Sequence, residues 1–114
     1  MTTGVRTIIF PVTNLDGAKA LYGQLLGVAP SMDAPYYVQF NVGDHEIGLD
    51  PNGHKQGMTG PVVYWDVADI QETLRQLVAG GAQMQQPVRD VGGGLLVAVV
   101  RDTDGNPIGL KQAP

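Results

Sequence analysis

The chain repeats one pattern twice, and this duplication restricts its fold more than any other feature of the sequence. The tetrapeptide Val12-Thr-Asn-Leu opens an amphipathic segment with helical spacing, and a similar one, Val67-Ala-Asp-Ile, opens a second such segment. Later in each half the tripeptide Ile-Gly-Leu occurs, first at residues 47–49 and again at residues 108–110. The repeated order is a strand, a helix and then three strands.

In the first half, β-branched or alternating residues predict strands at residues 5–12, 28–33, 36–42 and 45–50. Apolar residues recur at helical spacing from Leu15 onward. Asn14 is the expected N-cap of this helix, and Gly27 is the expected C-terminal stop. Residues 51–60 contain three glycines and no periodic apolar pattern, so a linker is expected there.

The second half predicts strands at residues 62–67, 82–88, 95–100 and 107–112. A helix is expected between them, with Asp69 and Glu72 forming a capping box and Gly80-Gly81 ending it. The glycines at residues 92–94 form a loop. Asp104-Gly105-Asn106 has the composition of a tight turn, so the last two strands are predicted to form a hairpin.

Composition excludes several classes of function. The chain has 114 residues, of which 43% are hydrophobic, enough for one compact unit with a core. It contains no cysteine, which rules out disulfides, thiolate metal sites and a cysteine nucleophile. The net charge is −4 and the basic residues are scattered, so nucleic acid is not an expected partner. No leader pattern or apolar run of about 18 residues is present, and we expect a cytoplasmic protein without membrane contact.

A family resemblance adds to this pattern. Residues 101–110, Arg-Asp-Thr-Asp-Gly-Asn-Pro-Ile-Gly-Leu, resemble the Asp-Pro-Asp-Gly-Asn signature of the vicinal-oxygen-chelate superfamily. That superfamily includes glyoxalase I, extradiol dioxygenases and bleomycin-resistance proteins, and it is built from a duplicated βαβββ module. The resemblance implies an α+β fold in which two tandem modules form a cup-shaped mixed sheet around a cavity, with the helices outside.

The same resemblance implies a domain organisation. We expect a single glyoxalase/bleomycin-resistance-like domain over residues 1–114. Module one would cover residues 5–50, the linker residues 51–60, and module two residues 61–112.

Side chains alternate across a strand, so each predicted strand has two faces. One face is apolar and is expected to pack under the helices; its residues are Ile8, Phe10, Val12, Ile47, Leu49, Val63, Trp65, Val67, Ile108 and Leu110. Trp65 is therefore expected in the core rather than as a platform for a ligand. The opposite face mixes small, aromatic and hydrogen-bonding residues, which suits a pocket. The alternative is that this face is simply the solvated side of a sheet.

The resemblance also implies metal positions, which this chain does not fill. Enzymes of the superfamily usually bind a divalent metal through His, Glu or Gln on the first and last strands of each module. The aligned positions here hold Thr7, Gly48, Val62 and Gly109. Valine and glycine side chains cannot coordinate a metal, and threonine is a poor ligand for such ions. His45, beside a turn, and His54, in the linker, are expected at the surface, so no metal and no cofactor is predicted.

The leading hypothesis is a metal-free binding protein that resembles the drug-sequestering bleomycin-resistance members. Its ligand would be a small organic molecule, cationic or aromatic, and no catalytic residue is assigned. The candidate ligand-binding residues are Tyr37, Gln39, Asn41, Glu46, Tyr64, Asp66 and Arg101. The tyrosines would stack on a planar ligand, while Glu46 or Asp66 would neutralise a cation. Relatives with this fold form dimers, so a homodimer is expected.

Two other hypotheses remain open. The chain could be a lyase or isomerase of the same superfamily that uses an unaligned carboxylate, Glu46 or Asp66, as a base or in a shifted metal site. Such an enzyme would hold a carboxyl group of raised pKa in its cavity. The third possibility is a regulatory or structural dimer, whose cavity would be closed and wholly apolar.

Overall fold

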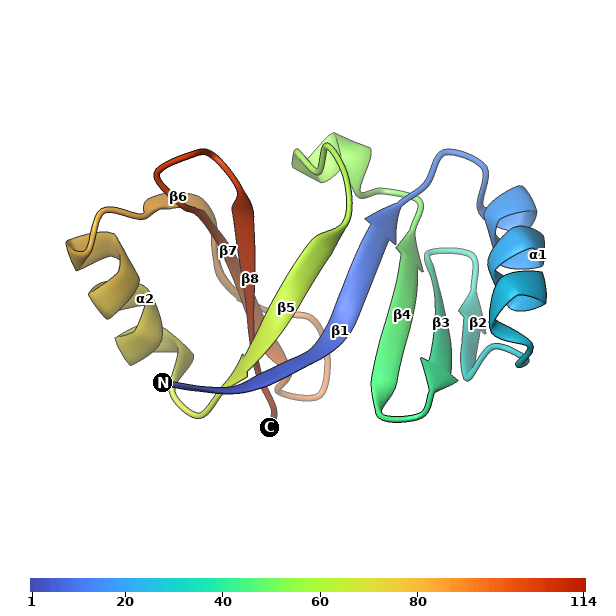
Figure 1. The fold of residues 1–114 in the computed structure, drawn as a ribbon, viewed down its shortest axis with the longest axis horizontal. Helices are drawn as coiled ribbons and strands as arrows, with labels where there is room; N and C mark the ends of the chain where they lie inside the picture. Colours follow the sequence, from blue (N-terminus) through green and yellow to red (C-terminus); the bar gives the residue numbers. More distant parts are fainter. The chain divides into compact units, whose positions relative to one another are not determined.

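The computed structural model describes residues 1–114, and the chain divides into two compact units. The N-terminal unit comprises residues 6–62, and the C-terminal unit comprises residues 1–5 together with residues 63–114. Each unit contains one α-helix and a run of four neighbouring strands, as the duplicated pattern predicts (Figure 1).

The N-terminal unit follows the predicted βαβββ order. Its elements are β1 (Thr2–Pro11, from residue 6 onward), α1 (Leu15–Leu26), β2 (Met32–Ala34), β3 (Tyr37–Val42) and β4 (His45–Asp50). The strands lie in the order β2-β3-β4-β1. Strand β1 runs parallel to β4, whereas the other pairs are antiparallel, so the sheet is mixed.

Local capping fixes both ends of α1, as predicted. The Asn14 side chain accepts a hydrogen bond from the Gly17 N–H at 3.0 Å, which satisfies one of the free N–H groups of the first turn. Gly27 ends the helix with a φ of 70°, a left-handed conformation that glycine adopts without strain. The helix packs on β3 and β4 over a core that includes Phe40 and Leu49 (Figure 1).

One strand prediction in this unit is wrong in part. The strand expected at residues 28–33 begins only at Met32, because Pro30 has no N–H for a ladder and the first hydrogen bond to β3 is donated by Ser31, to the Gln39 carbonyl at 2.8 Å. Residues 51–60, the expected linker, contain a short 3-10 helix, η1 (His54–Gln56), followed by the buried side chain of Met58.

The C-terminal unit repeats the arrangement. Its elements are β5 (Val62–Val67, from residue 63 onward), α2 (Ile70–Ala79), β6 (Gln83–Asp90), β7 (Leu96–Arg101) and β8 (Pro107–Gln112). The strands lie in the order β5-β8-β7-β6, with β5 parallel to β8 and the remaining pairs antiparallel. Helix α2 covers β6, β7 and β8 and buries Ile70 and Leu74 against Ala98, Val100 and Leu110 (Figure 1).

The predicted C-terminal hairpin is present. Strands β7 and β8 pair in antiparallel register, and Gly105 takes a φ of 86° in the turn between them. The Asp102 carboxylate organises this turn because it accepts hydrogen bonds from the N–H groups of Asp104 and Asn106, at 2.9 and 2.8 Å. The Asn106 side-chain amide donates to it as well, at 3.0 Å.

Trp65 was expected in the core, and this prediction is wrong. Its side chain is 38% exposed, whereas its neighbours Val62 and Tyr64, on the other face of β5, are buried. Helix α2 packs mainly on β6, β7 and β8. On the helix side of β5 it is Val67, at the end of the strand, that joins the core with Ile70 and Leu74, and not Trp65.

The capping box predicted for α2 forms only in part. Asp69 accepts a hydrogen bond from the Glu72 N–H at 3.1 Å, as expected for the N-cap. The Glu72 carboxylate, however, binds the side chains of Arg75 and Gln76 one turn further along the helix. Arg75 and Gln76 therefore take the carboxylate that the capping box needs to return to the N-cap.

The fold is therefore of the α+β class, with the predicted pair of βαβββ modules and one helix on each half-sheet. The closing of the modules into a cup, and the division into one domain with a linker at residues 51–60, stay predictions. No helix in the protein is long and apolar enough to cross a membrane.

The caps yield a test of local stability. Replacing Asp69 by alanine removes the side-chain acceptor of the first turn of α2 and should lower the free energy of unfolding by about 1 kcal/mol. Asp69→Ser keeps an N-cap acceptor and should retain most of that stability. Urea unfolding measures both variants, and equal losses in the two would contradict the capping role.

The turn at Asp102 yields a pH dependence. Hydrogen bonds from the side chain and the N–H of Asn106 lower the pKa of Asp102 from its ordinary value of 3.8. The ionised carboxylate therefore stabilises the folded chain above that ordinary value, and the contribution is lost as the pH falls through the lower pKa of the folded state. Unfolding followed below about pH 4 should show a steeper loss of stability in the wild type than in Asp102→Asn. Identical profiles of stability against pH for the wild type and Asp102→Asn would contradict a stabilising role of the ionised Asp102 carboxylate.

Candidate functional site

A polar surface covers the face of the N-terminal half-sheet that is opposite α1. The strand register places Thr7 on β1 beside Glu46 on β4, and Glu46 beside Asn41 on β3. In the next row, Gly48 on β4 lies beside Gln39 on β3. Because alternate residues share a face, these side chains meet on one side of three neighbouring strands.

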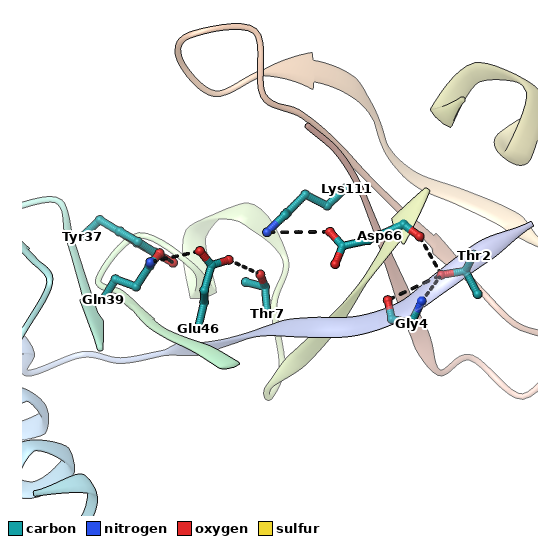
Figure 2. Close-up of polar contacts among 8 residues, drawn as sticks. All are labelled: Thr2, Gly4, Thr7, Tyr37, Gln39, Glu46, Asp66 and Lys111. Atoms are coloured by element: carbon teal, nitrogen blue, oxygen red, sulfur yellow. Dashed lines mark hydrogen bonds and ion pairs between the residues drawn. The ribbon is translucent and has the colours of Figure 1, made fainter. Parts of the chain in front are cut away.

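Hydrogen bonds join these side chains into one network, of which Figure 2 shows Thr7, Tyr37, Gln39 and Glu46. The Thr7 hydroxyl donates to Glu46 Oε1 at 2.6 Å, and Gln39 Nε2 approaches Glu46 Oε2 at 3.4 Å. The same Gln39 amide donates to Asn41 Oδ1 at 3.0 Å, while its carbonyl oxygen accepts from the Tyr37 hydroxyl at 3.4 Å. Thr7 is only 5% exposed, so its bond to the carboxylate is largely shielded from water.

The direction of these hydrogen bonds determines which groups of the network can still donate and which can only accept. The single hydroxyl protons of Thr7 and Tyr37, and both amide protons of Gln39, are directed within the network. The Glu46 carboxylate offers only lone pairs, whereas the Asn41 amide, whose oxygen accepts from Gln39, still carries two donor protons. Around Glu46 the face is therefore suited to groups that donate hydrogen bonds.

A tyrosine ring lies over a glycine in each unit. In the N-terminal unit, a Cβ built at Gly48 would overlap the Tyr37 hydroxyl and lie 2.7 Å from Tyr37 Cζ. In the C-terminal unit, a Cβ at Gly109 would lie 2.7 Å from Tyr64 Cδ1 and 2.8 Å from the Val63 carbonyl oxygen. Both glycines belong to the repeated Ile-Gly-Leu tripeptide, so the duplication extends to the aromatic ring that covers it.

The polar face of the C-terminal unit is built around an ion pair. Lys111 on β8 lies beside Asp66 on β5 in the parallel register, and Lys111 Nζ is 3.8 Å from Asp66 Oδ1 (Figure 2). The Asp66 backbone carbonyl also accepts a hydrogen bond from the Thr2 hydroxyl at 2.6 Å. Arg101 ends β7 beside Pro107, on the same face as Gly109 and Lys111.

The structure brings four of the seven candidate ligand-binding residues together in one network: Tyr37, Gln39, Asn41 and Glu46. The other three, Tyr64, Asp66 and Arg101, belong to the C-terminal unit. Tyr64 is 6% exposed and lies against Gly109, while Asp66 has a lysine of its own chain as partner.

Two residues of these networks were not among the candidates, namely Thr7 and Lys111. Strand alternation places both on the polar face, so the sequence does contain a signal for them. Their partners, Glu46 and Asp66, depend on the pairing of strands that are distant in the sequence.

The residues present do not fit the metal site that the family resemblance implies. The aligned positions offer one threonine hydroxyl, which is bonded to Glu46, and no side-chain donor at Gly48, Val62 or Gly109. Tyrosine rings lie where side chains at the two glycines would project. No group of three or more histidine or acidic residues is placed to hold a metal ion.

Comparison with known proteins gives a family match. The sequence model of the Glyoxalase/Bleomycin resistance protein/Dioxygenase superfamily matches residues 4–110. No curated protein matches the sequence at a significant level.

Solved structures share the fold at low sequence identity. A protein described as an NAD-dependent benzaldehyde dehydrogenase from Legionella pneumophila has a TM-score of 0.76 and 18% identity, covering 95% of this chain and 98% of its own. A superfamily member from Vibrio splendidus 12B01 has a TM-score of 0.72 and 15% identity, covering 96% and 99%. Methylmalonyl-CoA epimerase from Mycobacterium tuberculosis has a TM-score of 0.71 and 20% identity, covering 99% and 90%. At these identities the likeness concerns the fold alone.

The covered glycines provide a steric test. Gly109→Ala places a methyl group against the ring of Tyr64 and the backbone of Val63, and should cost about 1–3 kcal/mol of unfolding free energy. Gly48→Ala meets the far end of the Tyr37 side chain, which can swing aside, so a smaller loss is expected.

Gly60→Ala is the matched control because a Cβ there meets no atom within 4 Å. Its effect should stay within about 0.5 kcal/mol. Equal stability of all three variants in thermal and urea unfolding would contradict the close approach of the rings.

Proposed function

The chain belongs to the glyoxalase/bleomycin resistance protein/dioxygenase superfamily, and from this premise we propose that it is a metal-free protein that binds a small organic ligand. It would hold the ligand without reacting with it, as its resemblance to the bleomycin-resistance members suggests. The observation that carries the proposal is the polar network of Thr7, Tyr37, Gln39 and Glu46.

The chemistry of the network indicates the class of ligand. Its carboxylate, Glu46, accepts hydrogen bonds and carries negative charge, so it suits a ligand with donors such as an ammonium, amidine or guanidinium group. The Tyr37 ring beside the carboxylate adds an aromatic surface for a planar or cationic group. A cationic, partly aromatic molecule satisfies both features.

The alternative function, a lyase or isomerase with Glu46 as base, is less well supported. A general base works best when its surroundings favour the protonated form near neutral pH. Here the donors Thr7 and Gln39 contact the two carboxylate oxygens of Glu46, and such bonds favour the charged form. This environment makes Glu46 a better anchor for a cation than an acceptor of a substrate proton.

Two fragments of similar shape but opposite charge and opposite hydrogen-bonding role test the proposal. Benzamidine is a cation that only donates hydrogen bonds, whereas benzoate is an anion that only accepts them. In ¹⁵N–¹H NMR titrations, benzamidine should shift the signals of Gln39, Asn41 and Glu46 in a saturable way. A Kd on the order of 1 mM, about −4 kcal/mol, is reasonable for a fragment of about nine non-hydrogen atoms.

A substitution identifies the group responsible. Glu46→Gln removes the charge but keeps the shape, and should weaken benzamidine binding about tenfold or more. Asp44→Asn makes the same charge change at the exposed turn before β4 and should leave binding unchanged. Equal binding of benzoate, binding of neither fragment, or insensitivity to Glu46→Gln would contradict the proposal.

A further inference from the structure

Strand β2 carries an exposed apolar side chain beside the polar network of the N-terminal unit. Met32 is 40% exposed, and the antiparallel register places it opposite Gln39 on β3. Paired residues of neighbouring strands point to the same side of a sheet, so Met32 shares the polar face with Gln39. Met32 therefore flanks the network and does not belong to the core under α1.

Hydrogen bonds on both sides of Met32 fix the orientation of β2. Asp33 faces α1, where its two carboxylate oxygens accept hydrogen bonds from Lys19 Nζ at 3.2 and 3.0 Å. Before Met32, the N–H and the hydroxyl of Ser31 both donate to the Gln39 carbonyl oxygen, at 2.8 and 3.2 Å. Because side chains alternate along a strand, the contact of Asp33 with the helix directs Met32 away from it.

The second module shows that the fold does not require an apolar residue at this position. Across the outer strand and its two neighbours, the polar-face row that contains the conserved position of the Ile-Gly-Leu glycine reads Met32, Gln39 and Gly48 in the N-terminal unit, and Gln86, Val99 and Gly109 in the C-terminal unit. The outermost residue is thus methionine in one unit and glutamine in the other. Strand pairing accepts either, so the identity of Met32 is available for recognition.

We infer that Met32 forms an apolar subsite beside the Glu46 carboxylate, and that the ligand is an amphipathic cation whose apolar part extends from Glu46 over β3 to β2. This inference rests on the proposed function, because it takes Glu46 as the anchor of the charged group. Met32 lies two strands away from β4 and one row along from Glu46. Strand and residue spacing put their Cα atoms roughly 12 Å apart, so the ligand needs an apolar group well beyond its charged end.

The residues near Met32 favour this direction over the opposite one. Ala34 pairs with Tyr37 on the same face and adds apolar surface beside the aromatic ring. Along β3, by contrast, Asn41 follows Gln39 and carries an amide. Methionine itself suits such a subsite, since its unbranched, polarizable side chain adapts to different apolar groups and makes favourable contacts with aromatic rings.

An apolar extension of the benzamidine fragment tests the subsite. para-Butylbenzamidine keeps the amidine and the ring and adds a chain that only apolar surface can recognise. In NMR titrations of the wild type it should bind about tenfold more tightly than benzamidine, as expected if about two methylene groups become buried. In Met32→Gln, which copies the residue of the second module, the ratio of the two Kd values should fall to about twofold or less, whereas Met32→Leu should retain most of it.

Met84→Gln is the matched control. It makes the same replacement at a methionine of β6 that is 48% exposed and that pairs with Val100, on the helix side of the C-terminal unit. This variant should keep the wild-type ratio. A wild type that binds benzamidine without any advantage for the butyl compound, or an equal advantage in Met32→Gln, would overturn this inference and leave the proposed function standing. Binding of neither compound would overturn both.

A second measurement uses the wild type alone and so does not depend on the folding of a variant. The chain contains four methionines, and ¹³C labelling of their methyl groups gives each an observable NMR signal. With para-butylbenzamidine at saturation, intermolecular NOEs should connect the end of the butyl chain to the methyl group of Met32 and not to that of Met84. NOEs to Met84 instead, or none to Met32, would overturn the inference.

Discussion

The absence of a side chain at Gly48 and Gly109 is the constraint on which the polar face of each unit depends. Each glycine lets a tyrosine ring come close to the strand that carries it, Tyr37 in one unit and Tyr64 in the other. Any larger residue would have to displace that ring or the adjacent backbone. The glycines stand where the superfamily's metal enzymes are expected to carry a ligand, so a change from ligand to glycine both removes a donor and makes room for an aromatic ring.

The hydrogen bonds around Glu46 then determine what such a surface can recognise. Thr7 and Gln39 use their protons on the carboxylate, and Gln39 in turn accepts the proton of Tyr37. Hydrogen bonds to a carboxylate favour its ionised form. The same bonds explain why binding of a donor-rich molecule is better supported than proton abstraction. In the C-terminal unit the carboxylate of Asp66 has Lys111 as its partner, so the two units differ in charge chemistry although they share a topology.

Local chemistry made much of this fold predictable from sequence. The caps at Asn14 and Asp69 and the turn at Asp102 depend on residues within a few positions of each other, and each forms as expected or nearly so. The error at Trp65 has a different origin. Alternation assigns a side chain to a face of its strand, but whether a helix covers that face is a tertiary property. The pairing of Asp66 with Lys111 likewise depends on a parallel register between distant strands, which no local pattern specifies.

The central claim is that this protein binds its ligand without a metal ion, and a measurement of metal content tests it most directly. Protein purified without chelators can be studied by native mass spectrometry together with elemental analysis of the same sample, before and after addition of manganese, iron, nickel or zinc. The account predicts no stoichiometric metal under any of these conditions and an unchanged melting temperature. One tightly bound ion per chain, lost on substitution of Glu46 by alanine, would contradict it and would place the protein among the metal-dependent members of its superfamily.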